Sequence, residues 1–468
     1  MVTVYQANEQ VRKFWTGGKP KDTEYRPLRY LLKLSCGDGV LLQHLVTGEL
    51  LLLTEAESAR LDALPRAYEP WMDELIRKNF LVPSAQDDAE LVGNLRRLLS
   101  LTVRGKEITG YTVLPTSGCN ARCFYCYECD IPKTAMTAET ADALTEYMAA
   151  HCGGKKLHIG WFGGEPLLGE AIIDRICANL RAKGVAYSSG IITNGYLFTP
   201  ALADKAKADW ALSKAQITLD GTEETYNRTK AYVNAAENPY RRVLRNIGLL
   251  ADRGIPVNVR LNLGPHNAEE LEALIRELAE RFTDKTCIRP YVAVLTEDTG
   301  YEPYHAGSDG TDKLYARRAE LMRLTGTLGF TPPAKSGRPS TPSLKLTYCM
   351  ADNPGSLVVN PEGGLGKCEH FSFEKLVGDL KHGITDRQTL AAYGETDFGP
   401  GCGKCTLYPV CKRLKLCIPK PPCNRYKKEE LLEKEKARIR AVYAAYRAGA
   451  YAGEDSPEAD PPESGENC

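Results

Sequence analysis

The sequence lacks any long apolar run. Its 468 residues include no hydrophobic stretch long enough to span a bilayer, and the first residues contain no apolar signal core. These two absences predict a cytoplasmic protein without a membrane partner.

An excess of charge of one sign is lacking as well. Lysine and arginine together number 60, and so do aspartate and glutamate. Because proteins that bind nucleic acid present concentrated positive charge, this balance predicts no nucleic-acid partner. Hydrophobic residues make up 43% and charged residues 26%, values typical of a globular protein.

Cysteine, in contrast, is abundant, with 16 residues in the chain. In a reducing compartment such cysteines indicate metal or redox chemistry rather than a disulfide framework. The length of the chain predicts two or three domains.

Three of the cysteines form a compact CxxxCxxC motif directly after an apolar run at residues 108–114. They are Cys119, Cys123 and Cys126. Thiolates at this spacing can hold three corners of a [4Fe–4S] cluster and leave one iron open to a small molecule. Three buried or zinc-bound cysteines are the alternative, but that interpretation explains neither the aromatic Tyr125 nor the motifs downstream.

The motif closely resembles that of the radical S-adenosylmethionine (SAM) superfamily. The resemblance implies that the amine and carboxylate of SAM chelate the open iron. It also implies that SAM is cleaved reductively to a 5′-deoxyadenosyl radical.

From residue 108 onward, apolar strands alternate with helices. Strands are predicted at residues 109–114, 156–161, 187–193, 214–219, 256–263 and 286–294, with helices beginning near Thr137, Gly169, Pro200, Pro239 and Asn267. Repeats of this kind predict an α/β protein with parallel strands and crossover helices, here a partial (β/α)6 radical SAM barrel. Function in such barrels lies at the carboxyl ends of the strands, where the CxxxCxxC loop also falls.

Further motifs follow the other predicted strands. A GGEP sequence matches the family motif that contacts the amino group of SAM through its glutamate, and Arg260 and Asn262 match positions that contact the SAM carboxylate and ribose. Lys230 fills the place of a carboxylate-binding arginine, with Arg228 as the rival. The cofactor-binding residues implied by the resemblance are Tyr125, Gly163, Gly164, Glu165, Pro166, Thr193, Asn194, Asp220, Lys230, Arg260 and Asn262.

Seven cysteines near the C-terminus resemble the SPASM extension of radical SAM peptide-modifying enzymes, which houses two auxiliary [4Fe–4S] clusters. By position, the outer cluster takes Cys402, Cys405, Cys411 and Cys423, and the inner one takes Cys349, Cys368 and Cys417. The chain departs from the usual pattern, because five residues instead of three separate the cysteines at 411 and 417. The inner set has three thiols, which leaves an iron open. A pair of structural zinc sites is the alternative.

The N-terminal region is predicted to be a separate unit. Strands are expected at residues 30–35, 40–46 and 50–54, followed by a helix that begins with a capping box of Thr54 and Glu57 and by a second helix at 70–78. This order resembles the winged-helix-like recognition element that binds the leader of a precursor peptide in many peptide maturases. A cap that only covers the barrel is the alternative.

These predictions divide the chain at defined positions. The expected parts are a winged-helix-like domain (1–86), a helical linker (87–107), the barrel (108–300), a bridging region (301–345), a cysteine-rich SPASM domain (346–427), and a terminal helix with a disordered acidic tail ending in Cys468 (428–468).

The resemblance as a whole implies a maturase of the ranthipeptide or sactipeptide type, which forms a thioether in a ribosomally made precursor peptide bearing a leader. An electron donor such as a flavodoxin or ferredoxin is implied as a partner. No catalytic residue is assigned beyond the cluster ligands. The alternatives are carbon–carbon or ether crosslinking, epimerisation, formylglycine formation, and a non-catalytic iron–sulfur protein that binds peptides or relays electrons.

Overall fold

The computed structural model describes residues 1–15, 23–102, 107–295, 308–330, 338–411, 413–417, 423 and 425–451. The predicted acidic tail with Cys468, and parts of the predicted bridging region, lie outside these residues. Within the described ranges, every helix is too short or too polar to serve as a membrane span.

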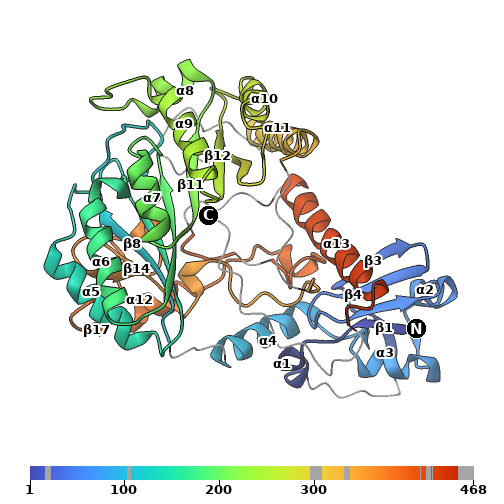
Figure 1. The fold of residues 1–468 in the computed structure, drawn as a ribbon. Coiled ribbons are helices and arrows are strands. Elements are labelled where there is room, and N and C mark those ends of the chain that lie inside the picture. The colour runs from blue at the N-terminus through green and yellow to red at the C-terminus, as the bar shows by residue number, and fades with distance from the viewer. Residues whose placement is uncertain are drawn as a thin grey trace.

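A large sheet dominates the structure, and its core is a row of parallel strands in chain order (Figure 1). The strands are β8 (Gly110–Thr116), β9 (Leu157–Gly163), β10 (Tyr187–Thr193), β11 (Leu212–Leu219), β12 (Val257–Leu263) and β13 (Ile288–Val294). Each pairs in parallel with its neighbours in sequence, as crossover helices require. The predicted α/β fold is confirmed.

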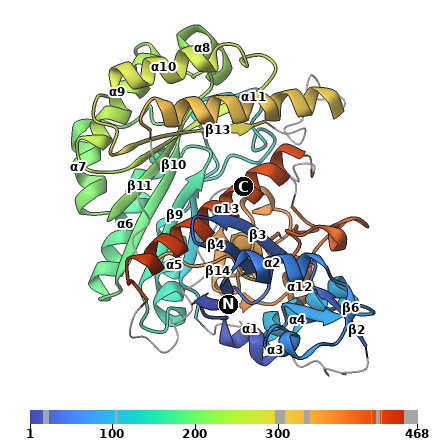
Figure 2. The same cartoon turned by 90° about the vertical axis from the view of Figure 1, so that its right-hand side faces the viewer.

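Helices cover the outer face of this sheet (Figures 1 and 2). They are α5 (Ala138–His151), α6 (Glu170–Ala182), α7 (Pro200–Ala208), α9 (Pro239–Ala251) and α10 (Leu271–Arg281). The side chains of Thr137, Thr199 and Asn238 cap the first turns of α5, α7 and α9 by accepting backbone N–H bonds.

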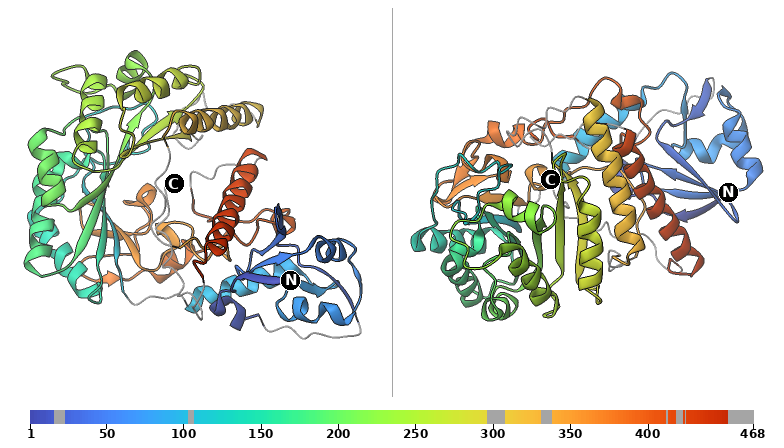
Figure 3. Two further views of the ribbon diagram at one scale, coloured as in Figure 1. Left: turned by 45° about the vertical axis from the view of Figure 1, so that its right-hand side comes forward. Right: turned by 90° about the horizontal axis from the view of Figure 1, so that it is seen from above.

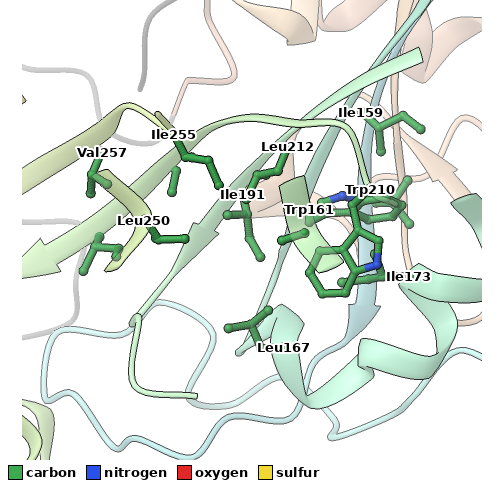
Figure 4. Close-up of a cluster of buried hydrophobic side chains, with 14 of the residues drawn as sticks. Ile159, Trp161, Leu167, Ile173, Ile191, Trp210, Leu212, Leu250, Ile255 and Val257 are labelled. Carbon is green, nitrogen blue, oxygen red and sulfur yellow. The ribbon is translucent and has the colours of Figure 1, made fainter. Parts of the chain in front are cut away.

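Alternate residues of the strands point outward and pack against the helices. Figure 4 shows part of this core, where Trp161 of β9 and Ile191 of β10 lie near Trp210. Burial of such side chains is the main stabilising force of the barrel.

Two helices differ from the sequence prediction. α10 begins at Leu271 and not near Asn267, because the Asn267 amide binds the carbonyl oxygens of Asp220 and Asn262 and caps a turn at Gly264. α8 (Glu223–Lys230) was not predicted, because its buried face carries Tyr226 and Lys230 with threonines instead of an apolar repeat.

The cysteine-rich C-terminal region extends the barrel sheet. β14 (Ser356–Val359) pairs in parallel with β8, and β15 (Gly364–Gly366), β16 (Gly378–Asp379) and β17 (Gly383–Ile384) follow antiparallel. A Cβ on Gly110 would lie 2.8 Å from the Ser356 Oγ, so glycine permits the close approach of β8 and β14. The strands around Cys349 and Cys368 therefore continue the barrel sheet.

The N-terminal region contains two small antiparallel sheets (Figure 1). One has the order β1 (Val2–Tyr5), β5 (Leu50–Leu53), β4 (Gly39–His44) and β3 (Leu31–Cys36); the other has β6 (Arg66–Ala67), β2 (Glu24–Pro27) and β7 (Leu81–Pro83). Its helical segments are α1 (Glu9–Lys13), α2 (Glu55–Asp62), the short 3-10 turn Pro70–Met72 and α3 (Asp73–Arg77). The three predicted strands and the Thr54–Glu57 capping box are confirmed.

Long helices connect the parts of the molecule. The linker helix α4 (Asp88–Thr102) and the terminal helix α13 (Arg425–Arg447) lie where helices were predicted, and α11 (Ser308–Thr327) lies within the predicted bridging region. α13 contacts both α11 and β1, and Figure 3 shows α11 and α13 side by side between the barrel and the N-terminal sheets. Arg318 pairs with Glu430 where the two helices meet.

We expect the contact of α13 with the N-terminal sheet to be important for stability. Ile439 of α13 is fully buried against Val4, Leu41 and Leu50. Ile439→Ala should lower the free energy of unfolding by about 2 to 5 kcal/mol, measured by urea denaturation. Glu429→Ala, at an exposed position of the same helix, should change it by less than about 0.5 kcal/mol. Equal effects of the two substitutions would contradict the docking of α13.

Candidate active site

The CxxxCxxC loop follows β8, and its three cysteines are half-buried. Burial raises the pKa of Cys119 to about 11 and that of Cys126 to about 12, and the neighbouring Cys123 thiol adds to both shifts. Three thiols together are the donor set expected for an iron–sulfur cluster with one open corner. Bound metal reverses the pKa shift, since a coordinating thiol loses its proton.

The two glycines of the GGEP sequence let this loop pack tightly against the end of β9. A Cβ on Gly163 would lie 2.2 Å from the Thr116 carbonyl oxygen, and one on Gly164 would lie 2.3 Å from that of Gly118. Gly163 also has a φ of 113°, which other residues rarely adopt. The glycines thus bring two backbone segments together beside Cys119.

Glu165 joins the GGEP sequence to the end of β10. It is fully buried, and its carboxylate accepts hydrogen bonds from Thr193 Oγ1 (2.7 Å), the Asn194 N–H (2.8 Å) and the Leu167 N–H (3.1 Å). Burial raises the pKa of Glu165 above its usual value. Asn194 in turn donates to Asn120 Oδ1 in the cysteine loop at 2.7 Å. Pro166 begins the short 3-10 turn Pro166–Gly169.

A second network surrounds Asp220 at the end of β11. Its carboxylate accepts from Tyr125 OH (2.8 and 2.9 Å), from Asn262 Nδ2 (2.9 Å) and from Lys230 Nζ (3.0 Å). Arg260 Nε donates to Asn262 Oδ1 at 2.8 Å. The structure therefore brings together five of the cofactor-binding residues that the sequence predicted.

Two basic residues were considered for the place of the family's carboxylate-binding arginine. Lys230 faces this network and Arg228 does not. The Lys230 side chain is 5% exposed and that of Arg228 is 66% exposed, with Glu224 as its partner. Burial alone would lower the pKa of Lys230, but the Asp220 carboxylate raises it well above its usual value. The Lys230 carbonyl also accepts the Arg122 N–H at 2.9 Å, which joins the end of α8 to the cysteine loop.

The seven C-terminal cysteines have two groups of neighbours, and their roles as ligands of two clusters stay a prediction. Burial raises the pKa of Cys368, and the nearby thiols of Cys349 and Cys417 add to the shift. The pKa of Cys411 is raised by burial and by its neighbours Cys423, Cys402 and Cys405. In the described part of the chain, no three His, Cys, Asp or Glu side chains are placed as ligands of a single metal ion.

Arg96 supports the loop of the second set, a role that the sequence analysis missed. This buried residue of α4 donates to the carbonyl oxygens of Tyr408, Pro409 and Cys411 at 2.9 to 3.1 Å. The only sign of this role in the sequence was an arginine within a leucine-rich segment.

Tyr127 and Glu128 connect the CxxxCxxC loop to Cys368 and were also missed. The Tyr127 ring lies 4.0 Å from that of His370, two residues after Cys368. Tyr127 OH and Glu128 Oε1 are buried without a hydrogen-bond partner among the described residues. Burial raises the pKa of Glu128 to about 7. Cys129 is exposed, with its Sγ 3.4 Å from Asp130 Oδ2.

Substitution at Asp220 tests the buried network. Asp220→Asn removes the carboxylate that neutralises Lys230, and an uncompensated buried charge costs about 3 to 5 kcal/mol of unfolding free energy. The control is Glu224→Gln, which changes the exposed partner of Arg228 and should cost less than about 1 kcal/mol. Denaturation of both variants measures the difference, and similar small losses would mean that Asp220 and Lys230 are not paired.

Substitution at Gly164 tests the packing of the cysteine loop. Because a Cβ there meets backbone atoms, Gly164→Ala should displace the loop and lower the iron bound after anaerobic reconstitution, by about one third if each of the three predicted cysteine sets binds one cluster. Gly326→Ala, where the Cβ meets open space in α11, should retain the full iron content. Unchanged iron in both variants would contradict the prediction.

Part of this chain is similar to known protein families and to curated proteins. Residues 113–278 match the family described as the Radical SAM superfamily. Among curated proteins, the radical SAM cyclopropyl synthase TigE of Paramaledivibacter caminithermalis is 23% identical over 201 residues, which cover 39% of this chain and 41% of that protein. GTP 3′,8-cyclase of Clostridium perfringens is 24% identical over 299 residues, 61% of this chain and 88% of that protein.

Two solved structures share the fold. Native anSMEcpe with bound AdoMet and the Cp18Cys peptide is 14% identical, with a TM-score of 0.54 over 73% of this chain and 99% of that chain. Streptococcus suis SuiB bound to the precursor peptide SuiA is 14% identical, with a TM-score of 0.50 over 83% of this chain and 94% of that chain. The fold, the cysteine loop and the family match agree that residues 113–278 form a radical SAM domain.

Proposed function

We propose that this protein is a radical SAM enzyme that installs a thioether crosslink in a ribosomally made precursor peptide. One observation carries the proposal: three thiols lie in the loop at the carboxyl end of β8, and two further sets of thiols lie in the region that extends the same sheet. Radical initiation needs the first set alone, so the others indicate a step beyond initiation.

The residues present fit three iron–sulfur clusters. Cys119, Cys123 and Cys126 would hold the one that binds SAM, and the C-terminal sets would hold the auxiliary clusters. When bound, the first cluster and SAM supply a one-electron cleavage that yields a hydrogen-abstracting radical. The inner auxiliary set has three thiols, which would leave one iron of its cluster without a cysteine ligand from this chain. A cysteine of the substrate peptide is our candidate for that ligand.

The polar networks would place SAM beside the cysteine loop. Arg260 and Asn262 are our candidates for its carboxylate and ribose, because they connect through Asp220 to Tyr125, which directly precedes Cys126 in the cysteine loop. Glu165 holds this loop through Asn194, which bonds to Asn120, and Lys230 holds it through Tyr125.

A peptide substrate is supported by the relatives and by the N-terminal sheets. anSMEcpe was solved with a bound peptide and SuiB with its precursor peptide, and this chain shares their fold. An extended leader can be bound by adding a strand to a sheet edge. In the four-stranded N-terminal sheet, β1 and β3 are the outer strands, and they are our candidates for leader binding. A flavodoxin or ferredoxin would supply the electron.

Incubation with a precursor peptide tests the proposal. The reconstituted protein, SAM and a low-potential reductant are mixed anaerobically with the cysteine-containing precursor encoded beside its gene. Formation of a thioether removes two hydrogens, so the peptide should lose two mass units.

The controls separate a thioether from the alternative reactions. A precursor with serine in place of each cysteine should keep its mass, because sulfur supplies the new bond. A loss of two units from this control would indicate a carbon–carbon or ether crosslink. Deoxyadenosine formation with an unchanged peptide mass would contradict crosslinking and leave epimerisation as the rival.

A further inference from the structure

The face of the barrel sheet opposite the helices is partly open to solvent, although Gln216 and Asn262 on that face are buried. Residues of β10 to β13 that point to the helices are buried, such as Val257 and Val259 of β12. On the other face, Ile192 of β10 is 36% exposed and Lys214 of β11 is exposed, although both lie on central strands. Described side chains therefore do not fill this inner face.

The inner face carries positive charge. The strands β8 to β13 contain no aspartate or glutamate, and their lysine and arginine residues are Lys214, Arg260 and Arg289. All three alternate with the buried residues that face the helices, so they belong to the inner face. The nearest strand-end acid, Asp220, is already neutralised by Lys230.

Arg289 differs from the exposed Lys214, and from Arg260, which bonds to Asn262, in having a buried donor without an acceptor among the described residues. No hydrogen bond or ion pair involves it within the described residues, and its Nε is buried without an acceptor. Asn258 lies beside it in the register of β12 and β13. A buried donor without an acceptor is destabilising, and an incoming acceptor would remove that cost.

The carboxylate of SAM does not account for Arg289. In the sheet register Arg260 lies opposite Tyr291, two residues nearer the carboxyl ends of the strands than Arg289. Two residues of a strand span about 7 Å, so one carboxylate cannot bind both guanidinium groups in bidentate fashion. Arg260 is the one connected to the cysteine loop, through Asn262 and Asp220.

We infer that Arg289, with Asn258 beside it, binds an aspartate or glutamate side chain of the substrate peptide. This inference rests on the proposed function, because it takes a peptide as the ligand. The planar guanidinium pairs with both carboxylate oxygens, and the amide of Asn258 supplies a further donor. Lys214 adds to the positive potential of the same face.

Chemical footprinting tests this subsite in the reconstituted full-length protein under anaerobic conditions with saturating SAM. The probes are acetyl-Gly-Gly-Asp-Gly-Gly-amide and its asparagine counterpart, which differ in one charge. The rate at which phenylglyoxal modifies Arg289 is followed by peptide mapping. The aspartate peptide should slow it at least about threefold and the asparagine peptide should not, while Arg276, exposed on α10, should be unaffected.

Variants give a second measurement by equilibrium dialysis of the radiolabelled aspartate peptide. Arg289→Gln should weaken its binding about tenfold, to the level of the asparagine peptide, whereas Arg289→Lys should retain part of the preference and Arg276→Gln all of it. High salt should reduce the preference.

The inference would be overturned if both peptides slowed the modification of Arg289 equally. It would also be overturned if SAM abolished the slowing by the aspartate peptide. Because peptide binding requires no turnover, failure of this subsite leaves deoxyadenosine formation intact. Absence of deoxyadenosine with an intact peptide preference would instead count against the proposed function.

Discussion

A buried ion pair between Asp220 and Lys230 joins the parts of the site. Asp220 ends β11, and Lys230 ends α8, which follows directly. Tyr125 of the cysteine loop bonds to both, so the loop is held against the barrel from one side. Glu165 and the GGEP glycines hold it from the other. The three thiols take their positions from these two supports.

The C-terminal cysteines are also held in place by contacts with other elements. β14 pairs with β8, the strand that leads into the CxxxCxxC loop, so both groups of thiols depend on one pair of strands. Tyr127 packs on His370 next to Cys368, and Arg96 holds the carbonyls of the loop around Cys411. The positions of the C-terminal thiols relative to the CxxxCxxC loop therefore depend on the β8–β14 pairing and on α4.

Much of the barrel was predictable from the sequence, for physical reasons. Apolar residues alternate with polar ones along strands such as β11 and β12 and face the helices, and capping residues such as Thr137 and Asn238 mark where helices begin. The CxxxCxxC motif was recognisable because its spacing is local to one loop, whereas the grouping of the C-terminal cysteines as ligands of two clusters stays a prediction. β14 and β15 were not, because they are short, contain glycines and pair with a strand far away in sequence.

The buried polar residues were predictable only in part. Asp220 and Lys230 follow recognisable motifs, but which of Lys230 and Arg228 points inward depends on how α8 packs. Arg96, Tyr127 and Arg289 have no motif; their importance comes from neighbours that are distant in the chain. Such contacts appear only when the fold is known.

Release of deoxyadenosine tests the central claim most directly. Reconstituted protein with SAM and dithionite should form it, and a variant with Cys119, Cys123 and Cys126 all changed to Ala should form none while keeping about two thirds of the iron. Deoxyadenosine from the variant, no deoxyadenosine from the intact protein, or loss of all iron from the variant would contradict the account.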